Sequence, residues 1–107
     1  MRLQVKGRNI EVSPTLMAYA ESKLARLERQ LAPDTAVEVE LVAETKHSRQ
    51  TAEATVFTKG PTLRASESTS DLRTSIDRMV DNLERQLVRY REKRRHEPRR
   101  RTAHHGI

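Results

Sequence analysis

Histidines and carboxylates are the groups in this 107-residue chain that could support metal binding or acid-base chemistry. The histidines are His47, His96, His104 and His105. None stands at the i, i+4 spacing of a helical zinc site, and the chain has no cysteine to complete one. The adjacent His104 and His105 resemble an incidental tail that could chelate only adventitious metal. The sequence therefore predicts neither a metal site nor a cofactor.

Three glutamates, Glu38, Glu40 and Glu44, share one face of a predicted strand. Because the other face of that strand is apolar, this face should be solvated, whereas a catalytic carboxylate usually needs a pKa shifted by burial or by a nearby like charge. The three glycines are isolated and form no phosphate-binding loop. We expect no enzyme activity. A small enzyme using this strand stays as an alternative that requires one of the three carboxyl groups to titrate abnormally.

Basic residues dominate the end of the chain. The net charge is +6 overall, but residues 1–84 hold 12 Lys and Arg against 13 Asp and Glu, while residues 85–101 hold 9 against 2. Such a local excess predicts a directed surface for a polyanion. The candidate RNA-binding residues are Lys23, Arg26, Arg29, Arg78, Arg85, Arg89, Arg91, Lys93, Arg94 and Arg95. The alternative is that these cations complement the helix dipole and pair with carboxylates such as Asp81 and Glu84.

The hydrophobic pattern indicates which elements carry these residues. Alternating apolar residues predict strands around Leu3–Val5, Val37–Ala43, Ala52–Val56 and Leu63–Ala65, the last one short and ending before the polar run 66–70. A turn is expected at Lys46–Arg49. Ser13 and Pro14 begin a helix that stops before Pro33, and Ser70 or Asp71 begins a second helix whose apolar face ends near Tyr90.

This order predicts an α+β fold, βαβββα, with a four-stranded sheet and both helices packed on one face, like a double-stranded-RNA-binding domain. We expect one domain at residues 1–95 and a basic tail at residues 96–107 that is disordered when free. Only 35% of residues are hydrophobic, so the core should be thin, with little room for a small-molecule pocket. No apolar run is long enough for a membrane span or a signal peptide, which favours a cytoplasmic protein.

The kind of RNA contact can also be predicted. A sheet that binds single-stranded RNA stacks bases on exposed aromatic residues, but the exposed face here carries Glu38, Glu40 and Glu53, with only Phe57 able to stack. The helical face is the better surface. Its cations favour a shape-selective contact with the backbone of folded RNA and do not favour base-specific recognition.

Two stretches resemble the ribosome hibernation-promoting factors, also called ribosome-associated inhibitors. Residues 7–16 (GRNIEVSPTL) are similar to the strand-to-helix opening of that family. Residues 71–77 (DLRTSID) and 82–93 (NLERQLVRYREK) resemble its second helix and basic end. The resemblance covers residues 1–95. Arg73 departs from the family pattern, which often has Tyr after the Asp-Leu pair.

The resemblance implies a factor that occupies the tRNA and mRNA channel of the small ribosomal subunit and promotes ribosome hibernation under stress, with ribosomal RNA as partner. It implies phosphate contacts by seven residues: Lys23, Arg26, Arg29, Arg85, Arg89, Arg91 and Lys93. Long family members add a module that pairs ribosomes, and nothing after Pro98 resembles it. The resemblance is therefore to either a short form or the N-terminal domain of a long form, and ribosome dimers would need that module or a helper factor. The alternative function is a protein-interaction module that modulates a transcription factor.

Overall fold

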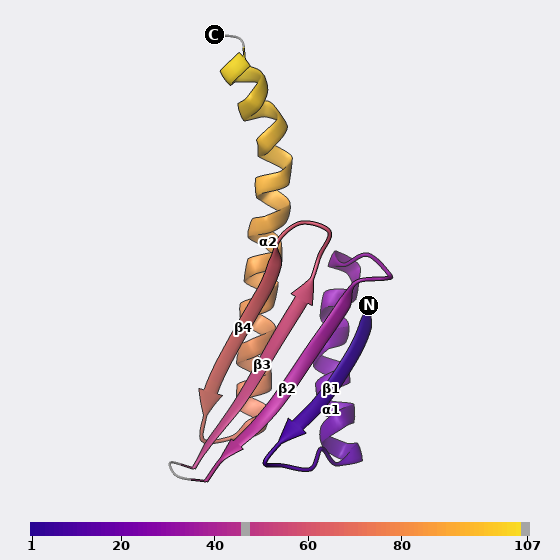
Figure 1. Ribbon diagram of the computed structural model, residues 1–107, viewed down its shortest axis with the longest axis vertical. Coiled ribbons are helices and arrows are strands. Elements are labelled where there is room, and N and C mark those ends of the chain that lie inside the picture. Colours follow the sequence, from indigo (N-terminus) through magenta and orange to yellow (C-terminus); the bar gives the residue numbers. More distant parts are fainter. Residues whose placement is uncertain (46–47, 106–107) are drawn as a thin grey trace.

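The computed structural model describes residues 1–45 and 48–105, with side chains described up to Glu92. Its elements follow the predicted order (Figure 1). They are β1 (Arg2–Arg8), α1 (Pro14–Leu24), the 3-10 helix η1 (Ala25–Gln30), β2 (Ala36–Glu44), β3 (Arg49–Phe57), β4 (Thr62–Thr69) and α2 (Leu72–His105). The predicted α+β fold is confirmed.

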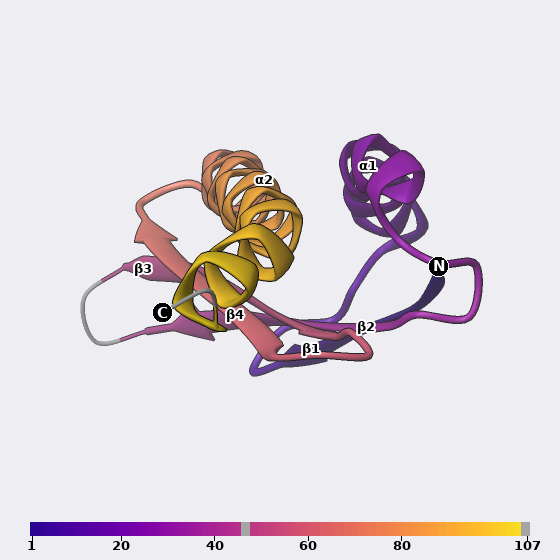
Figure 2. The same cartoon turned by 90° about the horizontal axis from the view of Figure 1, so that it is seen from above.

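The four strands form one mixed sheet in the order β1-β2-β3-β4. β1 runs parallel to β2 with Val5 opposite Val39, and β2, β3 and β4 form an antiparallel meander in which Val39 pairs with Ala54 and Ala54 with Ala65. Viewed from above, both helices lie on the same face of this sheet, which leaves the other face open (Figure 2). The expected turn between β2 and β3 includes Lys46 and His47, which lie outside the described residues.

The connection from β1 to α1 depends on a close backbone approach. A side chain at Gly7 would collide with the carbonyl oxygen of Ile10, and Asn9 takes a left-handed conformation with φ 61°. Ser13 then caps α1, because its hydroxyl accepts a 3.1 Å hydrogen bond from the Leu16 amide. Pro14 at the first helical position costs no hydrogen bond there. The sequence signals for this helix start are confirmed.

The first helix does not continue as one α-helix to Pro33. It ends at Leu24, and residues 25–30 form a 3-10 helix instead. Leu24 and Leu27 are both fully buried. Their three-residue spacing matches the three residues per turn of a 3-10 helix, so the tighter winding keeps both leucines on the core side. This difference changes the direction in which Arg26 and Arg29 leave the chain.

The core lies between the sheet and the two helices and consists of aliphatic side chains. Leu24, Leu27, Leu41, Leu83 and Leu87 are among its largest buried members. The remaining buried hydrophobic residues of this cluster are Leu16, Ala20, Val37, Val39, Ala52, Ala54, Val56, Ala65, Ile76, Met79 and Val80. Burial of this surface is the main stabilising contribution to the fold and fixes the directions in which both helices present their polar residues.

Polar contacts fix the start of α2. Asp71 caps the helix by accepting hydrogen bonds from the Thr74 amide at 3.0 Å and the Thr74 hydroxyl at 2.7 Å. The fully buried Ser75 donates to the Gln50 carbonyl and shares a 2.7 Å hydrogen bond with Thr69. Because Thr69 takes part in this network, β4 extends through residue 69, and the predicted short strand ending before the polar run was wrong.

A row of polar residues on α2 covers β4. Asn82 donates to Glu67 at 2.9 Å and Gln86 donates to the Arg64 carbonyl at 2.7 Å. One turn further along α2, the Tyr90 ring packs against Gly60 in the β3–β4 turn. These contacts, at four-residue steps, hold the helix along the edge of the sheet.

Beyond Tyr90, α2 leaves the sheet and projects away from it (Figure 1). The helix is described through Pro98 to His105, whereas the sequence predicted a disordered tail from residue 96. The division into a domain at 1–95 and a tail at 96–107 stays a prediction. No helix among the described residues is long and apolar enough to cross a membrane.

Candidate nucleic-acid interface

Helix α2 carries opposite charges on two of its sides. Its buried residues, from Ile76 to Leu87, face the sheet. Asp77, Asp81 and Glu84 follow one another at steps of four and three on the side that faces α1, and we call them the acidic stripe. Arg78, Arg85 and Arg89 follow at steps of seven and four on the side directed away from the sheet, and we call them the α2 crest.

The α2 crest is free for a polyanion. All three of its arginines are exposed, and among the described side chains no carboxylate forms an ion pair with them. The predicted pairing of Asp81 and Glu84 with cations of their own helix is therefore not what the structure shows. Both carboxylates reach across to Arg26 of η1 instead.

Lys23 and Arg26 of the first helical segment face the acidic stripe. The Arg26 guanidinium lies 2.8 Å from Oδ1 of Asp81 and 3.3 Å from Oε1 of Glu84, and Lys23 Nζ lies 3.5 Å from Oδ1 of Asp77. The hydrogen bond to Asp81 raises the pKa of Arg26, with smaller contributions from Glu84. These two predicted RNA-binding residues are thus ion-paired, unlike the crest.

Tyr19 lies in the same seam between the helices and was not among the predicted residues. Its hydroxyl donates a 2.7 Å hydrogen bond to Asp77, and this bond raises the tyrosine pKa above its ordinary value. The Arg73 guanidinium lies 4.8 Å and Lys23 Nζ 5.4 Å from the ring centre. Arg73 therefore places a cation on the face of the Tyr19 ring.

The other predicted cations divide into two groups. Arg29 on η1 and Arg91 on α2 are exposed, and within the described part of the chain neither forms an ion pair. Lys93, Arg94 and Arg95 belong to α2, but their side chains lie outside the described ones. The described and unpaired cations of the predicted set are therefore Arg29, Arg78, Arg85, Arg89 and Arg91.

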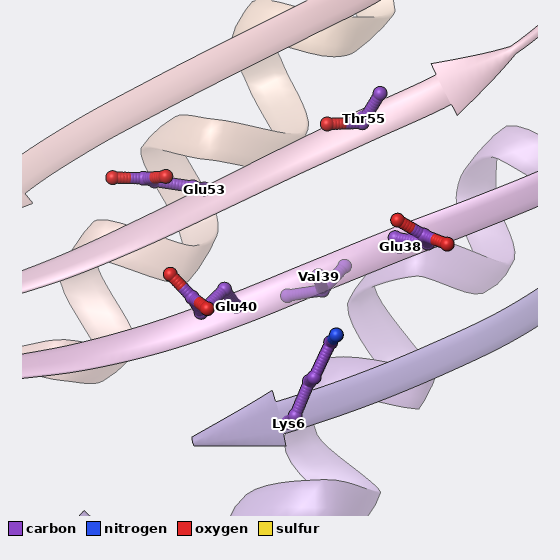
Figure 3. Close-up of a pocket in the computed structure, with 6 residues that line it drawn as sticks. All are labelled: Lys6, Glu38, Val39, Glu40, Glu53 and Thr55. Atoms are coloured by element: carbon purple, nitrogen blue, oxygen red, sulfur yellow. The ribbon is translucent and has the colours of Figure 1, made fainter. Parts of the chain in front are cut away.

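The open face of the sheet has the opposite character. Glu38, Glu40 and Glu53 line a shallow depression there with Lys6 and Thr55, and the side chains project from the strands toward solvent (Figure 3). Glu40 lies 3.5 Å from Arg8. No group of His, Asp and Glu among the described residues could hold a metal ion. The carboxylates at the centre of this face disfavour phosphate there, although Arg2, Lys6, Arg8 and Arg64 lie on the same face.

Phe57, on the same open face, is 44% exposed. It stands at the end of β3, opposite Ala36 and Thr62 and away from the carboxylates at the centre of the sheet. One aromatic ring without an aromatic neighbour on the adjacent strands cannot stack successive bases in the way that single-strand-binding sheets do.

Comparison with known proteins gives a consistent result. The profile of a family described as Sigma 54 modulation protein / S30EA ribosomal protein matches residues 3–95. A ribosome hibernation promoting factor of Azotobacter vinelandii is 33% identical over 93 residues, which cover 87% of this chain and 85% of that protein. Another, from Escherichia coli K12, is 30% identical over 93 residues, covering 87% of this chain and 96% of that protein.

Solved structures agree with the sequence relatives. The N-terminal domain of Protein Y from Thermus thermophilus superposes with a TM-score of 0.75 at 36% identity, covering 84% of this chain and 99% of that one. A ribosomal subunit interface protein from Coxiella burnetii gives a TM-score of 0.75 at 25% identity, covering 87% of this chain and all of that one.

Proposed function

The chain belongs to the Sigma 54 modulation protein / S30EA ribosomal protein family, and we propose from its charge distribution and its relatives that it binds ribosomes and promotes their hibernation. The relatives are named ribosome hibernation promoting factors, which favours this role over modulation of a transcription factor. A cytoplasmic location follows from a ribosomal partner. We further propose that the protein acts by occupancy and catalyses no reaction.

The observation that carries this proposal is the α2 crest. Three exposed guanidinium groups stand along one side of a helix, unpaired among the described side chains, while the open face of the sheet carries carboxylates. Such an arrangement orients the molecule with its helices toward RNA, because phosphates dominate the charge of the partner. In this proposal the helical side docks in the tRNA and mRNA channel of the small subunit, and the bound protein excludes both by steric overlap.

The extent of the interface is part of the proposal. Residues 1–95 would form the ribosome-binding domain, which is supported by the family match at residues 3–95, and residues 96–107 would extend it as a basic segment. The binding residues would be the five described cations of the predicted set that form no ion pair, namely Arg29, Arg78, Arg85, Arg89 and Arg91, together with Lys93, Arg94 and Arg95. Lys23 and Arg26 would contact phosphate only by leaving their carboxylate partners.

Sedimentation with isolated small subunits tests the proposal. Reversing Arg85 and Arg89 to Glu should abolish co-sedimentation without lowering the melting temperature, because both side chains are exposed. Reversing Arg2 and Arg64 on the open face of the sheet makes the same change in net charge and serves as the matched control. If the crest variant still co-sediments, or if both variants lose binding equally, the helical surface has been wrongly assigned.

The salt dependence of the same assay measures the size of the interface. The seven phosphate contacts that the family resemblance implies would give a slope of log affinity against log salt of roughly −5 to −6, and the eight residues proposed above would give roughly −5.5 to −7. The five unpaired cations alone would give roughly −3.5 to −4.5. A slope near zero would contradict binding through phosphate contacts.

A further inference from the structure

The acidic stripe on α2 lies beside Lys23 of α1 and Arg26 of η1 and forms ion pairs with both. One nitrogen of the Arg26 guanidinium contacts both Asp81 and Glu84, and Asp77 receives the Tyr19 hydroxyl as well as Lys23. The hydrogen-bonded residues lie 55 to 58 positions apart in the sequence, so these contacts exist only in the folded protein. The stripe therefore holds the cations of one helix against the other.

Stability alone gives little reason for such a stripe. The Arg26, Asp81 and Glu84 side chains are 39–53% exposed, and ion pairs exposed to this degree typically stabilise a protein by about 0–1 kcal/mol. A contribution so small leaves the pairs easy to exchange. It also means that a carboxylate could be replaced by an amide at little cost in folding.

The effect of the stripe on a polyanion is larger. The three carboxylates neutralise two cations, Lys23 and Arg26, that would otherwise attract any phosphate, and they repel phosphates that approach the seam between the helices. The arginines of the α2 crest stay unpaired among the described side chains, because the neighbouring stripe carboxylates pair with Lys23 and Arg26 instead. The helical surface is thereby divided into an unpaired basic crest and a neutralised seam.

We propose that Asp77, Asp81 and Glu84 are specificity-determining residues, which withhold Lys23 and Arg26 from indiscriminate phosphate contacts and confine RNA binding to the α2 crest and the cations near it. This inference rests on the proposed RNA-binding function. An RNA whose shape fits the crest binds without disturbing the seam. An ordinary RNA duplex binds with little affinity, because Lys23 and Arg26, which could contact its phosphates at any position, are already paired with carboxylates.

The test compares two RNA probes and two double variants. Asp81→Asn with Glu84→Gln removes the charge from two stripe residues while keeping their size. Glu38→Gln with Glu53→Gln makes the same change in net charge on the open face of the sheet. Affinity is measured at several salt concentrations for a mixed-sequence RNA duplex of about 20 base pairs, long enough for a shape-selective contact, and for isolated small subunits.

The stripe variant should bind the duplex about two- to fivefold more tightly than the wild type, the size expected when an exposed ion pair no longer competes. Its salt slope on the duplex should become steeper by about one, for one released cation. Small-subunit affinity should change less, so the preference for the subunit over the duplex falls. Adding Arg26→Gln to the stripe variant should remove the gain.

Three outcomes would overturn the inference: unchanged or weaker duplex binding by the stripe variant, an equal gain in the open-face variant, or a gain that persists without Arg26. The proposed function is tested separately, by wild-type sedimentation with small subunits. The duplex measurements need no ribosome, so a failure of this inference can be told apart from a failure of the proposed function.

Discussion

The Tyr19 hydroxyl donates a 2.7 Å hydrogen bond to Oδ1 of Asp77 and so joins α1 to α2 across 58 positions of sequence. The two helices lie over different strands of the sheet (Figure 2), and polar side chains join them in addition to the aliphatic core that they share. Tyr19 contributes an aromatic ring to this polar seam, with Arg73 and Lys23 close to the ring.

Replacing Tyr19 by Phe should lower the free energy of unfolding by about 1 kcal/mol at neutral pH, because the ring stays but the hydrogen bond to Asp77 is lost. The folded-state pKa of Tyr19 is raised above 10.0, so its stabilising contribution is present below pH 10 and is lost as the pH rises further. Urea denaturation from pH 8 to pH 11 should show the difference between the two proteins shrinking above pH 10.

A direct titration provides the control for this prediction. The chain has two tyrosines, so in a Tyr90→Phe background the ultraviolet absorbance of phenolate reports Tyr19 alone. Adding Asp77→Asn should bring the tyrosine pKa down toward its ordinary value, since Asp77 is the main cause of the shift. An unchanged titration would show that the hydrogen bond does not form in solution.

Asp71 should make the protein sensitive to acid. Hydrogen bonds from Thr74 hold the pKa of Asp71 below its ordinary value of 3.8, so its stabilising contribution is present above that pH and is lost as the pH falls through the folded-state pKa. At pH 7 we expect melting temperatures in the order wild type, Asp71→Asn, Asp71→Ala, because asparagine still caps a helix and alanine does not. Below pH 3.8 the wild type and Asp71→Asn should converge.

Asp34→Asn, a change at an exposed residue in the loop before β2, is the matched control for this experiment. It should follow the wild type over the whole pH range. A constant gap between the wild type and Asp71→Asn from pH 7 to pH 3 would mean that the cap charge contributes nothing.

Gly7→Ala should be the most destabilising of the glycine substitutions in the sheet region. Its methyl group would meet the Ile10 backbone carbonyl, with Val12 and Ile10 side-chain carbons at 3.1 and 3.2 Å, and backbone cannot move aside as a side chain does. We expect a loss of about 1–3 kcal/mol in the free energy of unfolding, measured by urea denaturation.

Gly60→Ala gives the comparison. The nearest atom to its added methyl would be the Tyr90 hydroxyl oxygen at 2.6 Å, which is the end of a side chain and can shift. The loss should therefore be smaller than at Gly7. Equal losses at the two sites would argue against the close backbone approach between β1 and the loop that follows it.

Local signals in the sequence predicted most of the fold. Alternation in Val37, Val39 and Leu41 indicated β2, the Ser13-Pro14 pair indicated the start of α1, and Asp71 indicated the cap of α2. The 3-10 segment was missed because Leu24 and Leu27 fit either helix type until the core fixes their direction. The length of β4 was missed because it depends on Ser75, which lies on another element.

The site was less predictable than the fold. Exposure of Arg85 and Arg89 followed from helical periodicity, which is local. The partners of Arg26 did not, because Asp81 and Glu84 reach it only once two helices distant in sequence pack on the same sheet. Tyr19 carried a weak signal, since it precedes Lys23 by one helical turn, but its contact with Arg73 is again tertiary.

The polar row on α2 also affects how the molecule behaves in a crowded solution. An outer strand such as β4 exposes backbone groups that could pair with a strand of another molecule and start a β-aggregate. Gln86 donates a hydrogen bond to one of those groups, the Arg64 carbonyl oxygen. Three residues further along β4, Asn82 donates a hydrogen bond to the Glu67 side chain. The helix that carries the basic crest therefore also covers part of the outer edge of β4 and hinders the addition of a strand from another molecule there.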